Sequence, residues 1–278
     1  MIHVVTDSTS DITQKDAAAM GVTVVPLTVR FGEQQFRDGV DMDSDAFYQE
    51  LQKNPTHPTT SQPTPEQFAD VYRSLLQQSD DSIVGLHISA KLSGTLQSAH
   101  IAAQEVAPER IHLVDTESAS AGLQLLLRAA LDDIASGCDA RAVAERTLGR
   151  RGRVSIYVLL DTLTYLQRGG RIRRSQALVG AMLSVKPVLK VLDGEVHQQG
   201  RVRSRQQGVD NILELLVPKL PVRLLAAFHC GSPELLPDLV VRLQALAPGV
   251  EIITGQVGPV VGAYTGPGGV GIAGLSAD

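Results

Sequence analysis

The sequence predicts an α/β protein, because short apolar segments of strand length alternate along the chain with segments of helical periodicity. The expected strands end in polar loops before helices, which is typical of β-α units. A chain of 278 residues is too long for one small core and suits one large or two medium domains. The basic run at residues 150–153 interrupts the pattern, as a hinge or a solvated turn. We therefore place the domain boundary there and expect domains at 1–153 and 154–278.

The composition is that of a folded globular protein, with 43% hydrophobic and 20% charged residues. A net charge of −5 argues against general nucleic-acid binding, which needs a broad basic surface. The two cysteines, Cys138 and Cys230, are too few for a disulfide framework or a metal cluster and fit a reducing, cytoplasmic setting. We expect no signal segment and no stable membrane insertion, because the chain starts directly in a strand pattern and no apolar run spans a bilayer.

The first expected strand, at residues 2–6, is apolar and buried. It ends in a polar loop that begins with Asp7 and includes Asp11. These carboxylates either order the loop and cap the helix expected around residues 17–20, or bind a metal ion together.

Residues 54–66 form a rigid loop that is rich in proline and hydroxyl groups. The elements expected before it are two strands in residues 22–31, a return strand through Phe36 and a short helix capped near Asp43. Prolines fix φ and extend the preceding residue, so the loop is shaped without being helical, and Pro65 opens the next helix. The loop is either an ordinary helix entry or a segment that presents Thr60 and Ser61 to a ligand.

The polar turn around Ser93 lies between an apolar strand at residues 83–88 and a helical pattern at residues 96–106. Helix N-termini leave backbone N–H groups unpaired and carry positive dipole character. The hydroxyls of Ser93 and Thr95 add hydrogen bonds at this corner, and Gly94 allows a ligand to approach the backbone closely. The corner therefore suits a carboxylate or a phosphate. The alternative is that Ser93 only caps the helix.

The densest basic patch of the chain follows a short helix near residue 165. Its members are Arg168, Arg171, Arg173 and Arg174. In an acidic protein such a patch is either a docking surface or a solvated loop, because it lacks the interleaved aromatic residues of a nucleic-acid groove.

The remaining elements continue the alternation of strands and helices. We expect strands at residues 111–114, 154–160, 185–192, 222–228 and 250–254, and helices at residues 121–135, 139–148, 213–216 and 235–246. Asp193-Gly194 is a strong hairpin signal. The glycine-rich tail at residues 258–272 permits tight turns and close packing, and it lacks the ending of a phosphate-binding loop.

Taken in order, these segments resemble the DegV family of fatty-acid-binding proteins. The matching segments are Asp7-Ser8 with Asp11, residues 59–63 with Pro65, residues 89–98, residues 161–172, Lys186-Pro187 with Asp193-Gly194, and residues 265–268. They cover nearly the whole chain, and the specificity lies in the ordered set rather than in any one motif.

The resemblance implies two α/β domains, each with a mostly parallel sheet flanked by helices, and a long-chain fatty acid buried between them. It implies that Thr60 and Ser93 hold the fatty-acid carboxylate. Other residues of the same corner are Ser61, Gly94 and Thr95. Many members have His before the Thr-Gly-Pro-Gly segment, where this chain has Tyr264, which donates a hydrogen bond through its hydroxyl.

The resemblance also implies a carrier that has no chemistry and no cofactor of its own. Members studied in bacteria present the fatty acid to a separate ATP-dependent fatty acid kinase, which makes an acyl phosphate for phospholipid synthesis. Basic residues of the family serve kinase docking, and Arg171 and Arg203 are the positions that carry this role here.

Two other classes of function stay open. A small-molecule phosphotransferase or hydrolase would use Asp7, Asp11 and Ser93. Against it, no nucleotide-binding loop is present, and Lys91 is the only His or Lys beside Ser93 in the sequence. A protein-interaction module would use the arginine patch.

Overall fold

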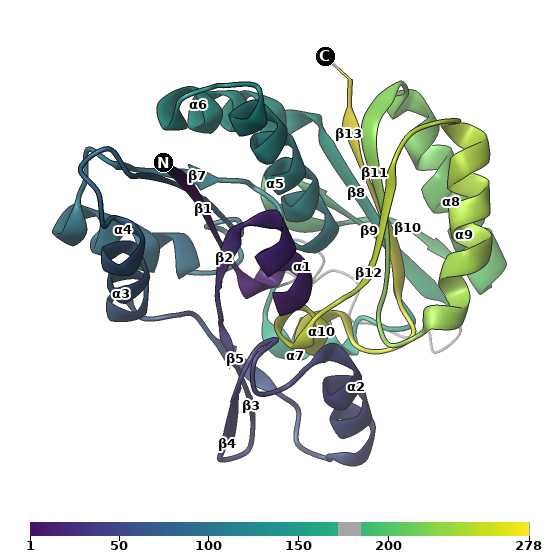
Figure 1. Ribbon diagram of the computed structural model, residues 1–278. Coiled ribbons are helices and arrows are strands. Elements are labelled where there is room, and N and C mark those ends of the chain that lie inside the picture. The colour runs from purple at the N-terminus through teal and green to yellow at the C-terminus, as the bar shows by residue number, and fades with distance from the viewer. Residues whose placement is uncertain (172–184, 278) are drawn as a thin grey trace.

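The structure, a computed structural model, describes residues 1–171 and 185–277. It consists of two large sheets with helices packed on them, and of a small sheet at the bottom of Figure 1. The α/β class predicted from the sequence is confirmed. Arg173 and Arg174 of the predicted basic patch lie outside the described residues.

The first large sheet is parallel and is buried on both faces. Its order is β2 (Val22–Val25), β1 (Ile2–Asp7), β6 (Ser82–His87) and β7 (Ile111–Asp115). One face packs against α3 (Pro65–Leu75) and α4 (Thr95–Val106), and the other against α1 (Gln14–Met20), α5 (Ser120–Ala135) and α6 (Ala140–Arg150). Strands that are covered on both sides are near-continuous apolar runs, which is why the sequence predicts β1 and β6 well.

The second large sheet is mostly antiparallel, which corrects the parallel sheet expected for the C-terminal domain. Its order is β10 (Glu195–Val202), β9 (Lys186–Leu192), β8 (Val154–Leu159), β13 (Val270–Ser276), β11 (Val222–His229) and β12 (Ile252–Gln256). Of these strands, β11 and β12 alone pair in parallel. The predicted hairpin at Asp193-Gly194 makes β9 and β10 antiparallel, and β13 enters between β8 and β11 against the direction of both. Helices α8 (Arg205–Leu216) and α9 (Leu236–Leu246) pack on this sheet.

The small sheet consists of β4 (Gln34–Arg37), β3 (Thr28–Phe31) and β5 (Thr59–Ser61), and α2 (Ser44–Lys53) packs beside it. Strand β5 lies in the segment predicted to be an irregular loop. Its Thr60 pairs with Val29 of β3 and is half-buried, whereas Thr59 and Ser61 are exposed. Pairing with β3 therefore fixes the direction in which Thr60 points.

Helix starts follow the local capping rules. Helix α3 begins with a capping box at Thr64 and has Pro65 in its first turn, as the sequence predicts. Helix α1 is capped by Thr13, so the expectation that Asp7 and Asp11 cap this helix is wrong. The hydroxyl of Thr13, which directly precedes the helix, takes that role.

Helix α5 lies between the two large sheets (Figure 1). One stripe packs with the second sheet and consists of Ala121, Leu125 and Ala129. A second stripe packs with the first sheet and consists of Leu123, Leu126, Leu127 and Ala130. Two apolar stripes on one helix are typical of a helix that is covered on two sides. The chain passes from the elements of the first large sheet to those of the second between residues 153 and 154. Because α5 packs against both sheets, the division at 1–153 and 154–278 stays a prediction.

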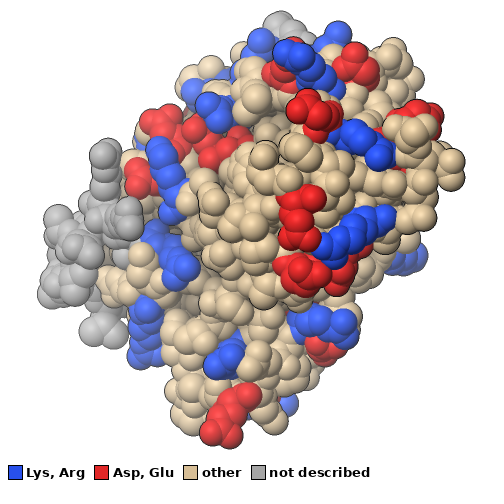
Figure 2. Space-filling model, turned by 90° about the vertical axis from the view of Figure 1, so that its left-hand side faces the viewer, with Lys and Arg blue, Asp and Glu red and all other residues tan. Residues whose placement is uncertain are grey.

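The glycine-rich tail is more regular than the sequence suggests. It contains α10 (Pro259–Thr265), which packs against α7 (Thr164–Gly169), and it ends in β13 inside the second sheet. Within residues 1–171 and 185–277, no helix has the length and apolarity needed to cross a membrane. On the face shown in Figure 2, acidic and basic side chains of the described residues are interspersed.

Candidate ligand-binding site

The candidate site lies at the carboxyl edge of the first sheet. From β1 the chain moves to β2 on one side and later returns as β6 on the other side of β1. Loops that leave two such neighbouring strands diverge, and ligands of open α/β sheets bind in the crevice between them. The loops after β1 and β6 contribute Thr9 and the turn around Ser93 to a cavity at this position.

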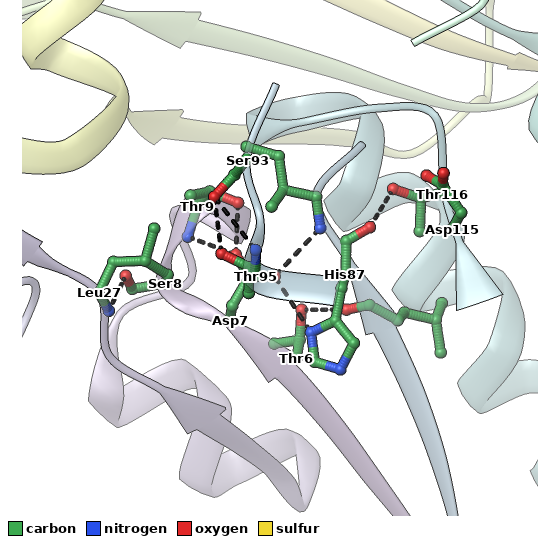
Figure 3. A network of polar contacts seen from close by, with 12 residues as sticks. Thr6, Asp7, Ser8, Thr9, Leu27, His87, Ser93, Thr95, Asp115 and Thr116 are labelled. Atoms are coloured by element: carbon green, nitrogen blue, oxygen red, sulfur yellow. Dashed lines mark hydrogen bonds and ion pairs between the residues drawn. The ribbon is translucent and has the colours of Figure 1, made fainter. Parts of the chain in front are cut away.

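A buried polar network holds the two loops together (Figure 3). The Asp7 carboxylate at the end of β1 accepts hydrogen bonds from the backbone N–H of Thr9 at 3.1 Å and from that of Ile88 at 3.0 Å. Its Oδ2 atom also lies 3.1 Å from Nδ1 of His87, and both side chains are fully buried. Asp7 therefore orders the loops, which is one of the two roles that the sequence predicts for it. Among the described residues no cluster of three or more His, Cys, Asp or Glu is arranged to hold a metal ion.

The turn after β6 places the Ser93 hydroxyl on the cavity wall. Ser93 Oγ lies 2.9 Å from Thr95 Oγ1, and it accepts a hydrogen bond from the Thr95 N–H at 3.3 Å. The N-cap position of α4 is Gly94 and not Ser93, but the Ser93 hydroxyl still satisfies the N–H of the first helical residue, Thr95.

Gly94 allows the loop before α3 to close over the turn. The Gln62 side chain crosses so near that a Cβ atom on Gly94 would stand 2.2 Å from its Oε1. Gln62 also donates a hydrogen bond to Ser98 Oγ at 3.0 Å. A larger residue at position 94 would thus require the Gln62 side chain to move away from the turn.

Tyr264, near the end of α10, joins three parts of the site. Its hydroxyl lies 2.5 Å from Thr60 Oγ1. Its ring packs on Gly169, where a Cβ atom would stand 2.3 Å from a ring carbon, and the Arg171 guanidinium lies 4.9 Å from the ring centroid. Arg171 also donates to the Leu92 carbonyl oxygen at 3.4 Å, next to Ser93. Thr60, Ser93, Arg171 and Tyr264 therefore form one connected group.

These four side chains border a cavity of about 390 Å³ that is lined by residues from both halves of the chain. Its apolar lining consists of Leu27, Ile88, Leu92, Ile156, Val158, Leu160, Leu166, Leu189, Val191, Val196, Val260 and Val261. Small-molecule sites have this volume and this mixture of an apolar wall with few polar groups. The arrangement suits an apolar molecule with one anionic group.

Comparison with known proteins decides the family. A family model described as an uncharacterised protein of the DegV family matches residues 1–276. This chain belongs to the DegV family. A DegV domain-containing protein of Streptomyces coelicolor is 36% identical over 98% of this chain and 97% of its own length.

Solved structures of DegV-family proteins have the same fold. One is described as fatty acid binding of a DegV family protein from Thermus thermophilus, with 35% identity, a TM-score of 0.89 and 99% of both chains covered. Another solved structure with this fold is described as a fatty acid (stearic acid)-binding protein from Eubacterium ventriosum, with 26% identity, a TM-score of 0.91, and 99% of this chain and 98% of that chain covered.

Within this DegV-family fold the residues expected at the site are distributed unevenly. Thr60, Ser61, Ser93 and Tyr264 line the cavity, and so does Arg171, which we expected on a docking surface. Thr95 is fully buried behind the turn, and Gly94 contacts a neighbouring hollow instead. Arg203 lies just before α8 and is exposed, away from the cavity lining.

Two groups of cavity-lining residues were not assigned to the site from the sequence. Gln62 belongs to the matched segment but was not assigned to the site, although its close approach to Gly94 connects the two loops. The wall formed by Ile156, Val158 and Leu160 follows the alternation of strand β8, a signal that any buried strand also gives.

The enzyme hypothesis finds little support in this geometry. Asp7 is fully buried and already accepts several hydrogen bonds, and Asp11 is not among the residues that line the cavity. The hydrogen-bond partner of the Ser93 hydroxyl is Thr95, whereas an activated serine needs a base in that place.

Proposed function

We propose that this DegV-family protein binds a long-chain fatty acid, with the carboxylate held by Thr60 and Ser93, and presents it to a separate fatty acid kinase. The observation that carries the proposal is the mostly apolar cavity with its group of hydroxyls and one guanidinium. The fatty acid binding described for the similar proteins from Thermus thermophilus and Eubacterium ventriosum supports the same class of ligand.

The apolar wall provides most of the binding free energy. About 14 methylene groups at ~0.8 kcal/mol each yield roughly 11 kcal/mol on burial. Association and ordering cost about 4 kcal/mol or more, which leaves a dissociation constant in the micromolar range. Transfer of the acyl chain from water into the cavity is thus favourable even without a contribution from the carboxylate.

The polar group keeps the carboxylate from being buried without partners, which would be costly. Thr60 and Ser93 donate through their hydroxyls, and Tyr264 offers a third hydroxyl beside Thr60. Arg171 adds a positive charge above the Tyr264 ring. In this arrangement Ser61 borders the carboxylate, while Gly94 and Thr95 shape the turn that presents Ser93.

Presentation to a kinase needs a route from the carboxylate to the outside. A polar hollow of about 380 Å³ adjoins the cavity at Ser93 and Arg171, and Lys91 and Glu195 also line it. We assign Arg171 and the exposed Arg203 to kinase docking. The cytoplasm is the proposed setting, because the partner uses ATP.

The first experiment is denaturing extraction of the purified protein, followed by mass spectrometry of the released material. We expect a stoichiometric long-chain fatty acid. The double variant Thr60→Ala/Ser93→Ala should retain less than about a hundredth of it after washing, because each hydrogen bond to a charged group contributes ~1.5–3 kcal/mol. Thr59→Ala is the matched control, since Thr59 is exposed on the opposite side of β5. Equal lipid content in the double variant and the control would contradict the carboxylate assignment.

A second experiment tests presentation. Lipid-loaded Arg203→Ala should bind fatty acid normally but support slower acyl-phosphate formation by a purified bacterial fatty acid kinase. Arg201→Ala is a suitable control, because Arg201 is an exposed arginine two residues away. Unchanged kinase rates with Arg203→Ala would remove Arg203 from the docking surface.

A further inference from the structure

Helix α10 separates the ligand cavity from a larger hollow of about 600 Å³ on the outside. Val260, Val261, Tyr264 and Thr265 line the cavity, whereas Gly258 and Pro259 line the hollow. The N-cap residue of α10 is Gly258, which has no side chain to accept the first N–H groups of the helix. Something else must satisfy them.

Two carboxyl groups from the N-terminal half take the place of the missing cap. Asp11 Oδ1 accepts a hydrogen bond from the Gly258 N–H at 2.9 Å, and the backbone N–H of Val260 interacts with the Asp38 carboxyl and lowers its pKa. A Cβ atom on Gly258 would stand 2.9 Å from Asp11 Oδ1 and 3.4 Å from Asp38 Oδ1. Both carboxyl groups therefore converge on the start of α10, and glycine leaves them room.

Asp38 is buried and Asp11 is half-buried, and both lie near the buried Asp7. Asp38 is 2% exposed, and the Oδ2 atoms of Asp11 and Asp38 are buried without a hydrogen-bond partner among the described residues. Burial raises the pKa of Asp38 to about 7 and that of Asp11 well above its usual range, and the charge of Asp7 raises both further. Close carboxyl groups in such a setting titrate as a pair, and this pair retains a proton at neutral pH.

Backbone strain marks the same place. Asp11 has φ 56° and Ser120 has φ 51°, in a region that residues other than glycine rarely adopt. The Ser120 side chain interacts with the Asp11 carboxyl and lowers its pKa, and Ser120 lines the cavity. Strained residues persist where their surroundings enforce them. Contacts thus run from the cavity wall through Ser120 and Asp11 to α10.

We propose that Asp11 and Asp38 are positioning residues of the fatty-acid site, which hold the start of α10 so that Tyr264, near its other end, meets Thr60. This inference rests on the proposed function. Neither carboxyl group touches the ligand, and each acts through α10. The pair also makes the position of α10 depend on pH.

The sign of this dependence follows from the raised pKa values. The protonated pair stabilises the folded site below the ordinary carboxyl pKa of about 4, and this contribution is lost as the pH rises through about 7. The pair should therefore hold α10 less firmly at pH 8 than at pH 6, and ligand affinity should fall as the fraction of molecules with α10 in place decreases. The titratable and charged groups that face the pair or border the outer hollow are Asp7, Tyr48, Cys230, Asp16, Asp43, Asp45, Arg128 and Glu251.

The test measures binding of radiolabelled stearate by equilibrium dialysis between pH 6 and pH 8.5, where the ligand stays ionised. We expect the wild-type affinity to fall about tenfold over this range. Asp38→Asn, which keeps an acceptor for the Val260 N–H and stays neutral, should flatten the profile. Asp38→Ala removes the acceptor and should weaken binding about tenfold (~1.4 kcal/mol) at pH 6. Asp45→Asn, an exposed carboxylate at the rim of the hollow, should leave the profile unchanged.

A second readout does not need the ligand. Hydrogen exchange over residues 257–266 should accelerate in Asp38→Ala and be restored in Asp38→Asn. A wild-type pH profile in Asp38→Asn, or wild-type exchange in Asp38→Ala, would overturn the inference. If Asp38→Ala does not fold, the pH dependence of stearate affinity in Asp38→Asn alone tests the inference. Absence of stearate binding by the wild type would refute the proposed function, and the exchange experiment would still decide on the carboxyl pair.

Discussion

Replacement of Tyr264 by Phe isolates one hydroxyl of the site. The phenyl ring keeps its packing on Gly169 and its place below the Arg171 guanidinium, so the change removes the 2.5 Å contact with Thr60 Oγ1 and little else. A hydrogen bond between neutral groups contributes ~0.5–1.5 kcal/mol, and one to a charged group ~1.5–3 kcal/mol. We expect the unfolding free energy of the empty protein to fall by about 1 kcal/mol, and the affinity for a fatty acid to fall roughly 10- to 150-fold.

Two measurements separate these effects. Urea unfolding of the delipidated protein reports the stability change, and displacement of a fluorescent fatty acid reports affinity. Loss of stability with unchanged affinity would mean that the Tyr264 hydroxyl only ties α10 to β5 and does not contact the carboxylate. The companion variant Tyr264→His tests the same position with a titratable ring, whose ordinary pKa is about 6.5. Its affinity should rise as the pH falls through that value, because the protonated ring attracts the carboxylate.

Two further predictions concern the turn and the stability of the fold. Gly94→Ala should weaken fatty-acid retention about tenfold or more, because the added methyl group displaces Gln62 and separates the Thr60 segment from the Ser93 turn; mass spectrometry of extracted lipid measures it. Asp133 forms ion pairs with Arg150 and with Arg146 that outweigh the effect of its burial and lower its pKa, so it stabilises the protein above about pH 4 and loses this effect on acidification. In Asp133→Asn the melting temperature should therefore fall less steeply than in the wild type between pH 5 and pH 3, and an identical slope would contradict the assignment.

The sequence predicted the elements whose signals are local. The buried strands β1 and β6 are apolar runs, the proline at position 65 marks a helix start, and Asp193-Gly194 forms the expected hairpin. Each of these signals depends on a few neighbouring residues and on rules of backbone geometry. Strand direction in the second sheet has no such signal, because it depends on where distant segments cross, and the expectation of a mostly parallel sheet was wrong there.

The tail and the site needed distant contacts. Strand β13 reads as a glycine-rich coil until it is placed between β8 and β11, where small residues suit a strand covered on both faces. Thr60 and Tyr264 are 204 positions apart, so no spacing rule connects them. The resemblance to the DegV family named both residues for the site, and the structure brings them together. No sequence motif indicates the role proposed for Asp38, because this role depends on a buried contact with α10.

The shared helix α5 has a consequence for how this protein unfolds. The two apolar stripes of α5 belong to the hydrophobic cores of both large sheets. Separation of either sheet from α5 would therefore expose leucine side chains of this helix. We therefore expect one cooperative transition in calorimetry rather than two separate ones. The α5 amides should be among the last to exchange with solvent. A fragment that ends near residue 153 would retain the helix but leave one of its stripes bare, and should aggregate rather than behave as an autonomous half.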